Sequence, residues 1–327
     1  DVEAYRSALR SLLNPDLPNH EWSYPPSILL LGVPLSWFPI FPAYLLFICV
    51  TLLALHVVLK PFQFPFIAHL AILLGPPGMI SITFGQNGNL TGALMIGALA
   101  FSQRRPWLAG MMAGLLTIKP QLGILLPIAY LAAGNWKAIF SAILTAVLMA
   151  LATGFFFGFH VWLGFLTATA PLMSGIMNAP FPQDYQVNSV TFFITARYLG
   201  FDVPMAHLFQ AFFTLAAMLL TFMIWRPPGR LDIFSRSLLT TLLVIMATPY
   251  GYSYDMVPYS VAVAWWFMRN PAPNRLFFAA LWLFPAFAHI PGFFGIGLSI
   301  MVPAIFIIWV LREERILFGA KPWIAAG

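Results

Sequence analysis

Long apolar runs, with basic residues scattered between them in ones and twos, restrict the fold of this chain more than any other feature of its sequence. No Asp, Glu, Lys or Arg occurs between Lys60 and Arg104, or between Lys137 and Asp184. Overall, 61% of the 327 residues are hydrophobic and 8% are charged, whereas soluble domains are near half apolar and about a quarter charged. Because so few charges cannot solvate a protein of this size, the sequence predicts an integral membrane protein that crosses the bilayer many times.

The formal net charge of +6 does not indicate nucleic-acid binding, because the basic residues are scattered between apolar runs as loop anchors are. We therefore expect membrane lipids as partners and no nucleic acid. Cys49 is the single cysteine, so the chain forms neither an intrachain disulfide nor a cysteine metal cluster. The chain opens at Asp1 with a polar stretch and no Met, and we expect it to be a fragment that lacks its first span.

A membrane helix needs roughly 20 apolar residues, and the runs predict an all-α polytopic helix bundle with about eleven spans. The expected spans lie near residues 41–59, 62–80, 89–103, 106–118, 121–134, 138–158, 205–225, 233–249, 255–268, 275–290 and 294–311. Two further segments, 26–37 and 188–199, predict helices that do not span.

We expect one transmembrane domain over residues 1–327. Residues 1–40 would form an outer loop with a short non-spanning helix, and residues 160–204 a second outer-loop region. Pro171, Pro180 and Pro182 make this second region look irregular.

The distribution of basic residues predicts the orientation. If residues 1–24 lie outside, one side of the membrane receives Lys60, Arg104, Arg105, Lys137, Arg226, Arg230, Arg269, Arg275, Arg312, Arg315 and Lys321. The other side receives most acids, namely Asp1, Glu3, Asp16, Glu21, Asp184, Asp202 and Asp255. The positive-inside rule then makes the first side cytoplasmic. We expect a multi-pass protein of the plasma (inner) membrane with a cytoplasmic C-terminus and its polar chemistry facing the periplasm or cell exterior.

Two polar interruptions of the apolar runs are candidates for phosphate binding. Gln86 and Asn87 lie in a glycine-flanked turn, where their amides can donate and accept hydrogen bonds; a plain loop with Asn89 as helix cap is equally compatible. Lys119, followed by Pro120 and Gln121, lies at the membrane edge, where a compact cation suits a phosphate. The alternative for Lys119 is a side chain that snorkels to the headgroups.

A second set of polar residues could contact a sugar or an acceptor. Tyr250 and Tyr254 can stack on a sugar face or belong to an interfacial aromatic belt. Asp255 begins an apolar run, where it could also simply favour a helix N-terminus. Asn188 and His289 lie in predicted outer segments and join this set.

Asp1 and Glu3 are candidate general bases, although solvated loop acids would look the same. The six histidines show no metal-ligand spacing, so we expect no metal site and no cofactor.

Several segments, in this order, resemble bacterial members of glycosyltransferase family 87. They are Tyr24 to Pro26, FGQNGNL at 84–90, RPWLAG at 105–110, GLLTIKPQ at 114–121, Leu126-Pro127, and TPYGYSYD at 248–255. The family has the GT-C fold and includes the polyprenyl-phosphate-mannose-dependent mannosyltransferases of phosphatidylinositol mannoside synthesis. The resemblance covers nearly the whole chain. Those mannosyltransferases carry histidines where this chain has Tyr254 and Asp255, so the chain is similar to another bacterial branch.

The resemblance implies an inverting sugar transfer from a polyprenyl-phosphate carrier, at the outer face, to a lipid or glycan acceptor of the cell envelope. It implies that Asp1, in the first outer loop, is the base that accepts the acceptor proton. Lys119 matches the lysine of the family's Lys-Pro motif, and we infer that it faces the donor phosphate, with Gln86, Asn87 and Gln121 on the same side. Tyr250, Tyr254 and Asp255, with Asn188 and His289, would line the sugar or acceptor side.

Two other classes of function compete with this prediction. A transporter or flippase of lipid-linked sugars would carry polar residues at mid-membrane and an inverted repeat, and no clear repeat is seen. A non-catalytic scaffold of envelope assembly is the third possibility.

Overall fold

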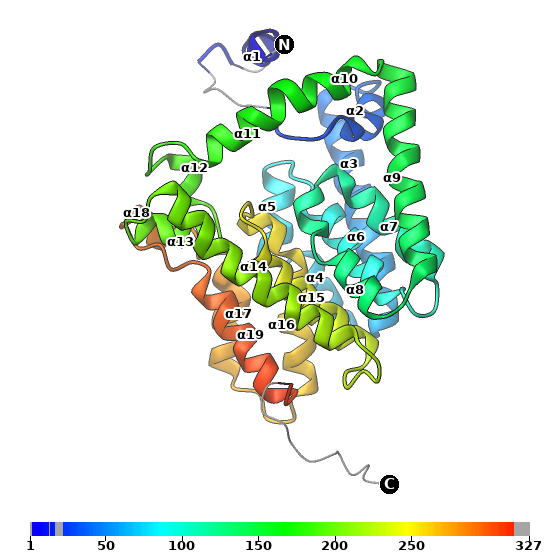
Figure 1. Ribbon diagram of the computed structural model, residues 1–327, viewed down its shortest axis with the longest axis vertical. Coiled ribbons are helices and arrows are strands. Elements are labelled where there is room, and N and C mark those ends of the chain that lie inside the picture. The colour runs from blue at the N-terminus through cyan, green and yellow to red at the C-terminus, as the bar shows by residue number, and fades with distance from the viewer. Residues whose placement is uncertain (1, 13, 17–21, 317–327) are drawn as a thin grey trace.

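The computed structural model describes residues 2–12, 14–16 and 22–316, and Figure 1 shows them as a bundle of helices. The helices of the first half are α1 (Val2–Leu12), η1 (Pro26–Ile28), α2 (Leu29–Leu35), α3 (Ile40–Leu59), η2 (Lys60–Phe62), α4 (Phe66–Leu73), α5 (Pro76–Thr83), α6 (Gly88–Ala100), α7 (Pro106–Leu115), η3 (Leu116–Ile118), η4 (Pro120–Gly123), α8 (Leu126–Ala132) and α9 (Trp136–Phe157). Those of the second half are α10 (His160–Gly164), η5 (Phe165–Thr169), α11 (Ala170–Met177), α12 (Asp184–Val187), α13 (Phe192–Tyr198), α14 (Val203–Trp225), α15 (Ile233–Ala247), η6 (Ser253–Met256), α16 (Val257–Arg269), α17 (Arg275–Phe287), α18 (Ile290–Phe293) and α19 (Met301–Glu313). The predicted all-α class is confirmed.

Four helical stretches of the described residues are long and apolar enough to cross a membrane: Ile40–Phe62, Trp136–Phe157, His160–Met177 and Val203–Trp225. A fifth crossing is possible if α4 and α5, which meet at a bend of 42°, form one span. The predicted count of about eleven is not confirmed. Most of the other expected spans correspond to helices of 7–15 residues, which are too short to cross about 30 Å of hydrocarbon alone.

The stretch His160–Met177 differs from its prediction as an irregular outer-loop segment. It is helical throughout, passing from α10 through a π-helical turn into α11. Pro171 is the second residue of α11 and comes directly after the π-helical turn. The proline therefore lies within a continuous helical stretch and does not make the segment irregular. Figure 1 shows α10 and α11 lying across the end of the bundle.

The core of the bundle lies around α6, α15 and α16. Almost every residue of α6 and every residue of α15 from Ser235 onward is buried. By contrast, α3, α9 and α14 expose apolar side chains along much of their length. A helix that is apolar all round is typical of a buried or lipid-facing position, so these three form the outer wall.

Glycines on α6 bring the functional segments together. A Cβ at Gly88 would lie 2.0 Å from the carbonyl oxygen of Tyr254, and one at Gly92 would lie 3.0 Å from Val257. At Gly88 the neighbouring atom belongs to another backbone, and only glycine allows so close an approach. The turn before α6 therefore lies directly against η6.

Candidate active site

Lys119 is the most buried lysine that the structure describes, with 3% of its surface exposed. It is the residue between the short helices η3 and η4, where its extended backbone conformation separates two turns. Pro120 causes this break, because proline disfavours helical conformation in the residue before it. The break directs the ammonium group into the protein rather than toward the headgroups, so Lys119 does not snorkel.

Asp255 neutralises this ammonium group. Its Oδ1 lies 2.5 Å from Nζ of Lys119, and only 6% of Asp255 is exposed. Its Oδ2 accepts a hydrogen bond from the backbone N–H of Tyr252 at 3.2 Å. Both oxygens of the carboxylate are therefore engaged, as burial of an ion requires.

The segment that carries Asp255 is held in place on both sides. Thr248 Oγ1 accepts from the N–H of Tyr250 at 3.2 Å and donates to its carbonyl at 2.9 Å, which turns the chain at the end of α15. The N–H of Val190 donates to the carbonyl of Gly251 at 2.9 Å. These hydrogen bonds hold the segment in its closed position beside Lys119.

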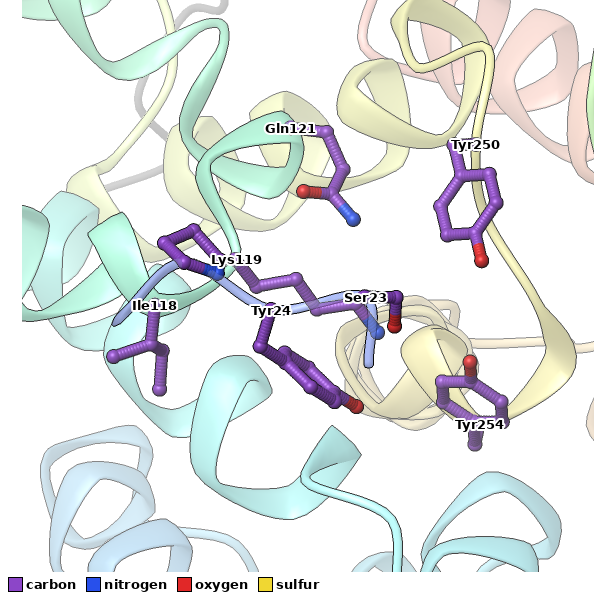
Figure 2. Close-up of a pocket in the computed structure, with 8 residues that line it drawn as sticks. Ser23, Tyr24, Ile118, Lys119, Gln121, Tyr250 and Tyr254 are labelled. Atoms are coloured by element: carbon purple, nitrogen blue, oxygen red, sulfur yellow. The ribbon is translucent and has the colours of Figure 1, made fainter. Parts of the chain in front are cut away.

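A small cavity lies next to the ion pair, and Figure 2 shows Lys119 extending toward Tyr254 beside it. Its lining comes from three parts of the chain: Ser23, Tyr24, Pro25, Ile118, Lys119, Gln121, Tyr250 and Tyr254. Its volume is about 20 Å³, which is room for roughly one water molecule. A sugar phosphate therefore requires these segments to separate.

Tyrosine hydroxyls surround the cavity as neutral hydrogen-bond donors. Burial, followed by the nearby charge of Asp255, raises the pKa of Tyr24 to about 12. Burial also raises the pKa of Tyr250, and that of Tyr254 well above the usual range. The ring of Tyr254 lies under the Lys119 ammonium at 4.5 Å, a cation–π contact.

The turn with Gln86 and Asn87 lies beside the same cluster. The hydroxyl of Tyr24 donates to Oε1 of Gln86 at 3.5 Å. Asn87 is buried, and its Oδ1 has no hydrogen-bond partner among the described residues. An unpartnered buried amide oxygen is costly, which is typical of a position where a ligand or water completes the contacts.

Not all predicted site residues line this cavity. Asn188 is exposed and precedes Ser189, which pairs with Tyr252 in an isolated bridge. His289 precedes α18, and its ring contacts Phe293 at 5.8 Å between centroids. Asp1, the predicted base, lies outside the described residues. The roles of all these residues stay predictions.

The structure adds Tyr24 and Ser23, which were not predicted as site residues. Tyr24 belongs to the Tyr-Pro-Pro segment, so the signal was present in the sequence without an assigned role. Trp22 connects it to α1 through edge-to-face contacts with Tyr24 and Tyr5, at 6.1 and 6.0 Å. The segment that carries the predicted base is thus linked to the cavity by aromatic contacts.

No group of three or more His, Cys, Asp and Glu that could hold a metal occurs in the described part of the chain. The arrangement instead offers one buried cation, several neutral donors and a carboxylate. The Lys119 ammonium has three N–H donors and gives one to Asp255, so it can donate to a second anion. This set of donors could hold an oxyanion such as a phosphate only after the segments around the cavity separate.

Comparison with known proteins gives one family. The sequence model of the family described as "Glycosyltransferase family 87" matches residues 22–249, which are 228 of the 327 residues. The match includes Lys119, Tyr24 and the turn with Gln86, and ends six residues before Asp255. Searches of curated proteins and of solved structures gave no match.

Proposed function

The chain belongs to glycosyltransferase family 87, and from this premise we propose that it transfers a sugar from a polyprenyl-phosphate carrier to a lipid or glycan acceptor. We expect mannose as the sugar and inversion at its anomeric carbon. We place the reaction at the periplasmic or exterior face of the plasma membrane, with the C-terminus in the cytoplasm. The observation that carries the proposal is the buried Lys119 beside a cavity lined by neutral donors.

Lys119 would stabilise the leaving group. As the glycosidic C–O bond to the carrier breaks, negative charge develops on the phosphate oxygens. A preorganised ammonium in a buried site stabilises such charge more strongly than water does. Gln86, Asn87 and Gln121 would supply further hydrogen bonds to the same phosphate.

Asp255 would hold the Lys119 ammonium in position before the donor binds. A buried ammonium needs an anion beside it, because an unpaired charge is costly away from water. The carboxylate at 2.5 Å from Nζ supplies that anion in the free protein. We therefore assign Asp255 a positioning role toward Lys119, beside its predicted place on the sugar or acceptor side.

Asp1 would act as the general base. In this step the acceptor hydroxyl attacks the anomeric carbon from the side opposite the phosphate, and its proton passes to the Asp1 carboxylate. The new glycosidic bond forms as the bond to the phosphate breaks, and polyprenyl phosphate leaves. Tyr250 and Tyr254 would orient the sugar with their hydroxyls or rings.

Donor binding must open the site, because a cavity of about 20 Å³ cannot hold a sugar phosphate. Three segments would have to separate, around Tyr24, Lys119 and Tyr254. The polyprenyl tail would remain in the hydrocarbon region, which explains a site at the membrane boundary.

The experiment that tests the proposal is sugar transfer from radiolabelled polyprenyl-phosphate-mannose into lipid extract. Membranes would carry the protein as wild type, Asp1→Asn, Lys119→Gln, or the matched control Lys137→Gln on an exposed surface position. We expect label with wild type and control, and transfer reduced by about 10²–10³ in Lys119→Gln. Full activity of Asp1→Asn would disprove the assignment of Asp1 as the general base.

A lack of label with every variant, alongside an active control enzyme, would contradict mannose as the sugar. Translocation of a lipid-linked sugar across liposomes without transfer would replace the proposal with the flippase alternative.

A further inference from the structure

A second cavity lies at the far end of α15 from the candidate active site. It is lined by the segment that joins α14 to α15, and α15 contains 15 residues, or about 22 Å of helix. Figure 1 shows this connection near the C-terminal end of the bundle, away from α1 and α2. The cavity has a volume of about 300 Å³, large enough for a headgroup.

Two arginines border this cavity. Arg226 and Arg230 lie on either side of the Pro227-Pro228-Gly229 turn, and both are exposed. Among the residues that the structure describes, neither guanidinium group forms a hydrogen bond or an ion pair. Their charges are therefore available to an anion.

A third arginine lies beneath the same turn. Arg236 is 7% exposed, and its Nη2 donates to the carbonyl of Leu231 at 3.2 Å. A Cβ on Gly229 would lie 1.5 Å from Nη2, so the turn packs directly on the guanidinium. Nε of Arg236 has no hydrogen-bond partner in the described structure. A buried cation under two exposed ones raises the positive potential of the whole turn.

The nearby acids are occupied elsewhere. Asp232 accepts from the N–H groups of Phe234 and Ser235 with Oδ1, and its Oδ2 lies 3.1 Å from Arg269. Glu314 accepts from the indole of Trp266 at 2.9 Å. The remaining acid at this end, Glu313, is exposed on α19. The charge of Asp232 also acts on Arg236 and offsets part of the positive charge of the turn. Arg226 and Arg230 have no acidic partner of their own among the described residues.

An apolar stripe leads from the arginines along the lipid-facing side of α14. Leu215, Leu219 and Met223 follow each other at four-residue intervals and are all exposed, so they lie on one face of the helix. α14 is one of the helices long enough to span the membrane. Met223 also lines the cavity, which makes the cavity and the lipid-facing stripe continuous.

We propose that this cavity binds an anionic phospholipid, whose phosphate contacts Arg226 and Arg230 and whose acyl chain lies along Leu215, Leu219 and Met223. Guanidinium groups match phosphate with paired N–H donors, and basic pockets between membrane helices bind anionic headgroups. The apolar stripe favours a lipid over a free phosphate, because only a lipid uses both parts of the surface. The site goes beyond the proposed sugar transfer and does not depend on it.

The test measures lipid binding to the full chain, purified in a non-ionic detergent, by native mass spectrometry and by thermal shift. Phosphatidylglycerol and phosphatidylcholine with the same acyl chains are compared, with glycerol phosphate as a soluble competitor. The test variant is Arg226→Gln/Arg230→Gln. Its matched control is Arg104→Gln/Arg105→Gln, which removes two exposed arginines from another helix connection.

We expect phosphatidylglycerol to bind more tightly than phosphatidylcholine, and to bind roughly 30-fold more weakly to the test variant, corresponding to about 1 kcal/mol for each arginine. The control should keep wild-type binding. Equal loss in both variants, or no preference between the lipids, would overturn the proposal. Equal competition by glycerol phosphate would show a site for a free anion instead.

Thermal unfolding without lipid shows whether the test variant folds. If it does not, the single substitutions Arg226→Gln and Arg230→Gln provide the comparison, and each should weaken binding about fivefold.

Discussion

The two ends of α15 differ in how the positive charge beside them is neutralised. At one end, Lys119 is paired with Asp255 beside a cavity of about 20 Å³. At the other end, Arg226 and Arg230 face a cavity of about 300 Å³ without an acid. The first site is closed and internally neutralised, whereas the second is open and needs an external anion. A charged residue in a membrane protein therefore supports the inference of a bound ligand only once its partners within the protein are known.

The largest expected effect comes from breaking the ion pair. Asp255→Asn leaves the Lys119 ammonium buried without its counter-ion, which costs about 3–5 kcal/mol of stability. Thermal unfolding in detergent should show a lowered midpoint. Lys119→Met/Asp255→Asn removes both charges and should recover most of the loss. A double variant as unstable as Asp255→Asn would contradict an ionic cause.

The packing of the two ends can be compared with glycines. Gly88→Ala places a Cβ against the backbone carbonyl of Tyr254, which cannot withdraw, and should cost about 1–3 kcal/mol. Gly229→Ala meets the end of the flexible Arg236 side chain and should cost less. Gly175→Ala, with open space around it, is the control. An equal loss of stability at Gly88 and Gly229 would contradict the proposed difference in packing between the two ends.

Salt should weaken lipid binding at Arg226 and Arg230 but should have little effect on the Lys119–Asp255 pair. The charges at Arg226 and Arg230 are exposed, so raising salt from about 0.1 M to 1 M should reduce the preference for phosphatidylglycerol several-fold. The Lys119–Asp255 coupling, measured with the two single variants and the double variant, should change little because the pair is buried. A coupling that falls in parallel with lipid binding would mean that the pair is accessible to solvent.

The smallest expected effect is on the pH dependence of the unfolding midpoint. Burial raises the pKa of Tyr24 from 10.0 to about 12, so the folded state favours the neutral hydroxyl. Its contribution to stability is complete below pH 10 and is lost as pH rises toward 12. Tyr24→Phe should therefore show a flatter decline of the unfolding midpoint in this range. An identical decline in both proteins would place the sensitivity at other tyrosines.

The sequence predicted the long helices best. The spans expected at 41–59, 138–158 and 205–225 correspond to Ile40–Leu59, Trp136–Phe157 and Val203–Trp225, because uninterrupted apolar runs of this length leave few alternatives. The resemblance to glycosyltransferase family 87 is confirmed by the family match.

Contacts between residues far apart in the chain could not be predicted from the sequence. Lys119 and Asp255 were both candidates, but they are 136 positions apart, and their pairing depends on the approach of η6 to α6 at Gly88. Tyr24 was missed for the same reason, since its contact with Gln86 joins segments 62 positions apart. The helix at His160–Met177 was missed because Pro171 suggested irregularity, whereas the helix continues through this residue after a π-helical turn.

The most direct test of the account is the rate of sugar transfer from the polyprenyl-phosphate donor by Lys119→Met/Asp255→Asn. This variant should fold with stability near that of wild type, yet transfer sugar about 10²–10³ times more slowly, because the cation for the leaving phosphate is gone. Transfer near the wild-type rate by the folded variant would show that the ion pair serves the fold alone and would contradict the account.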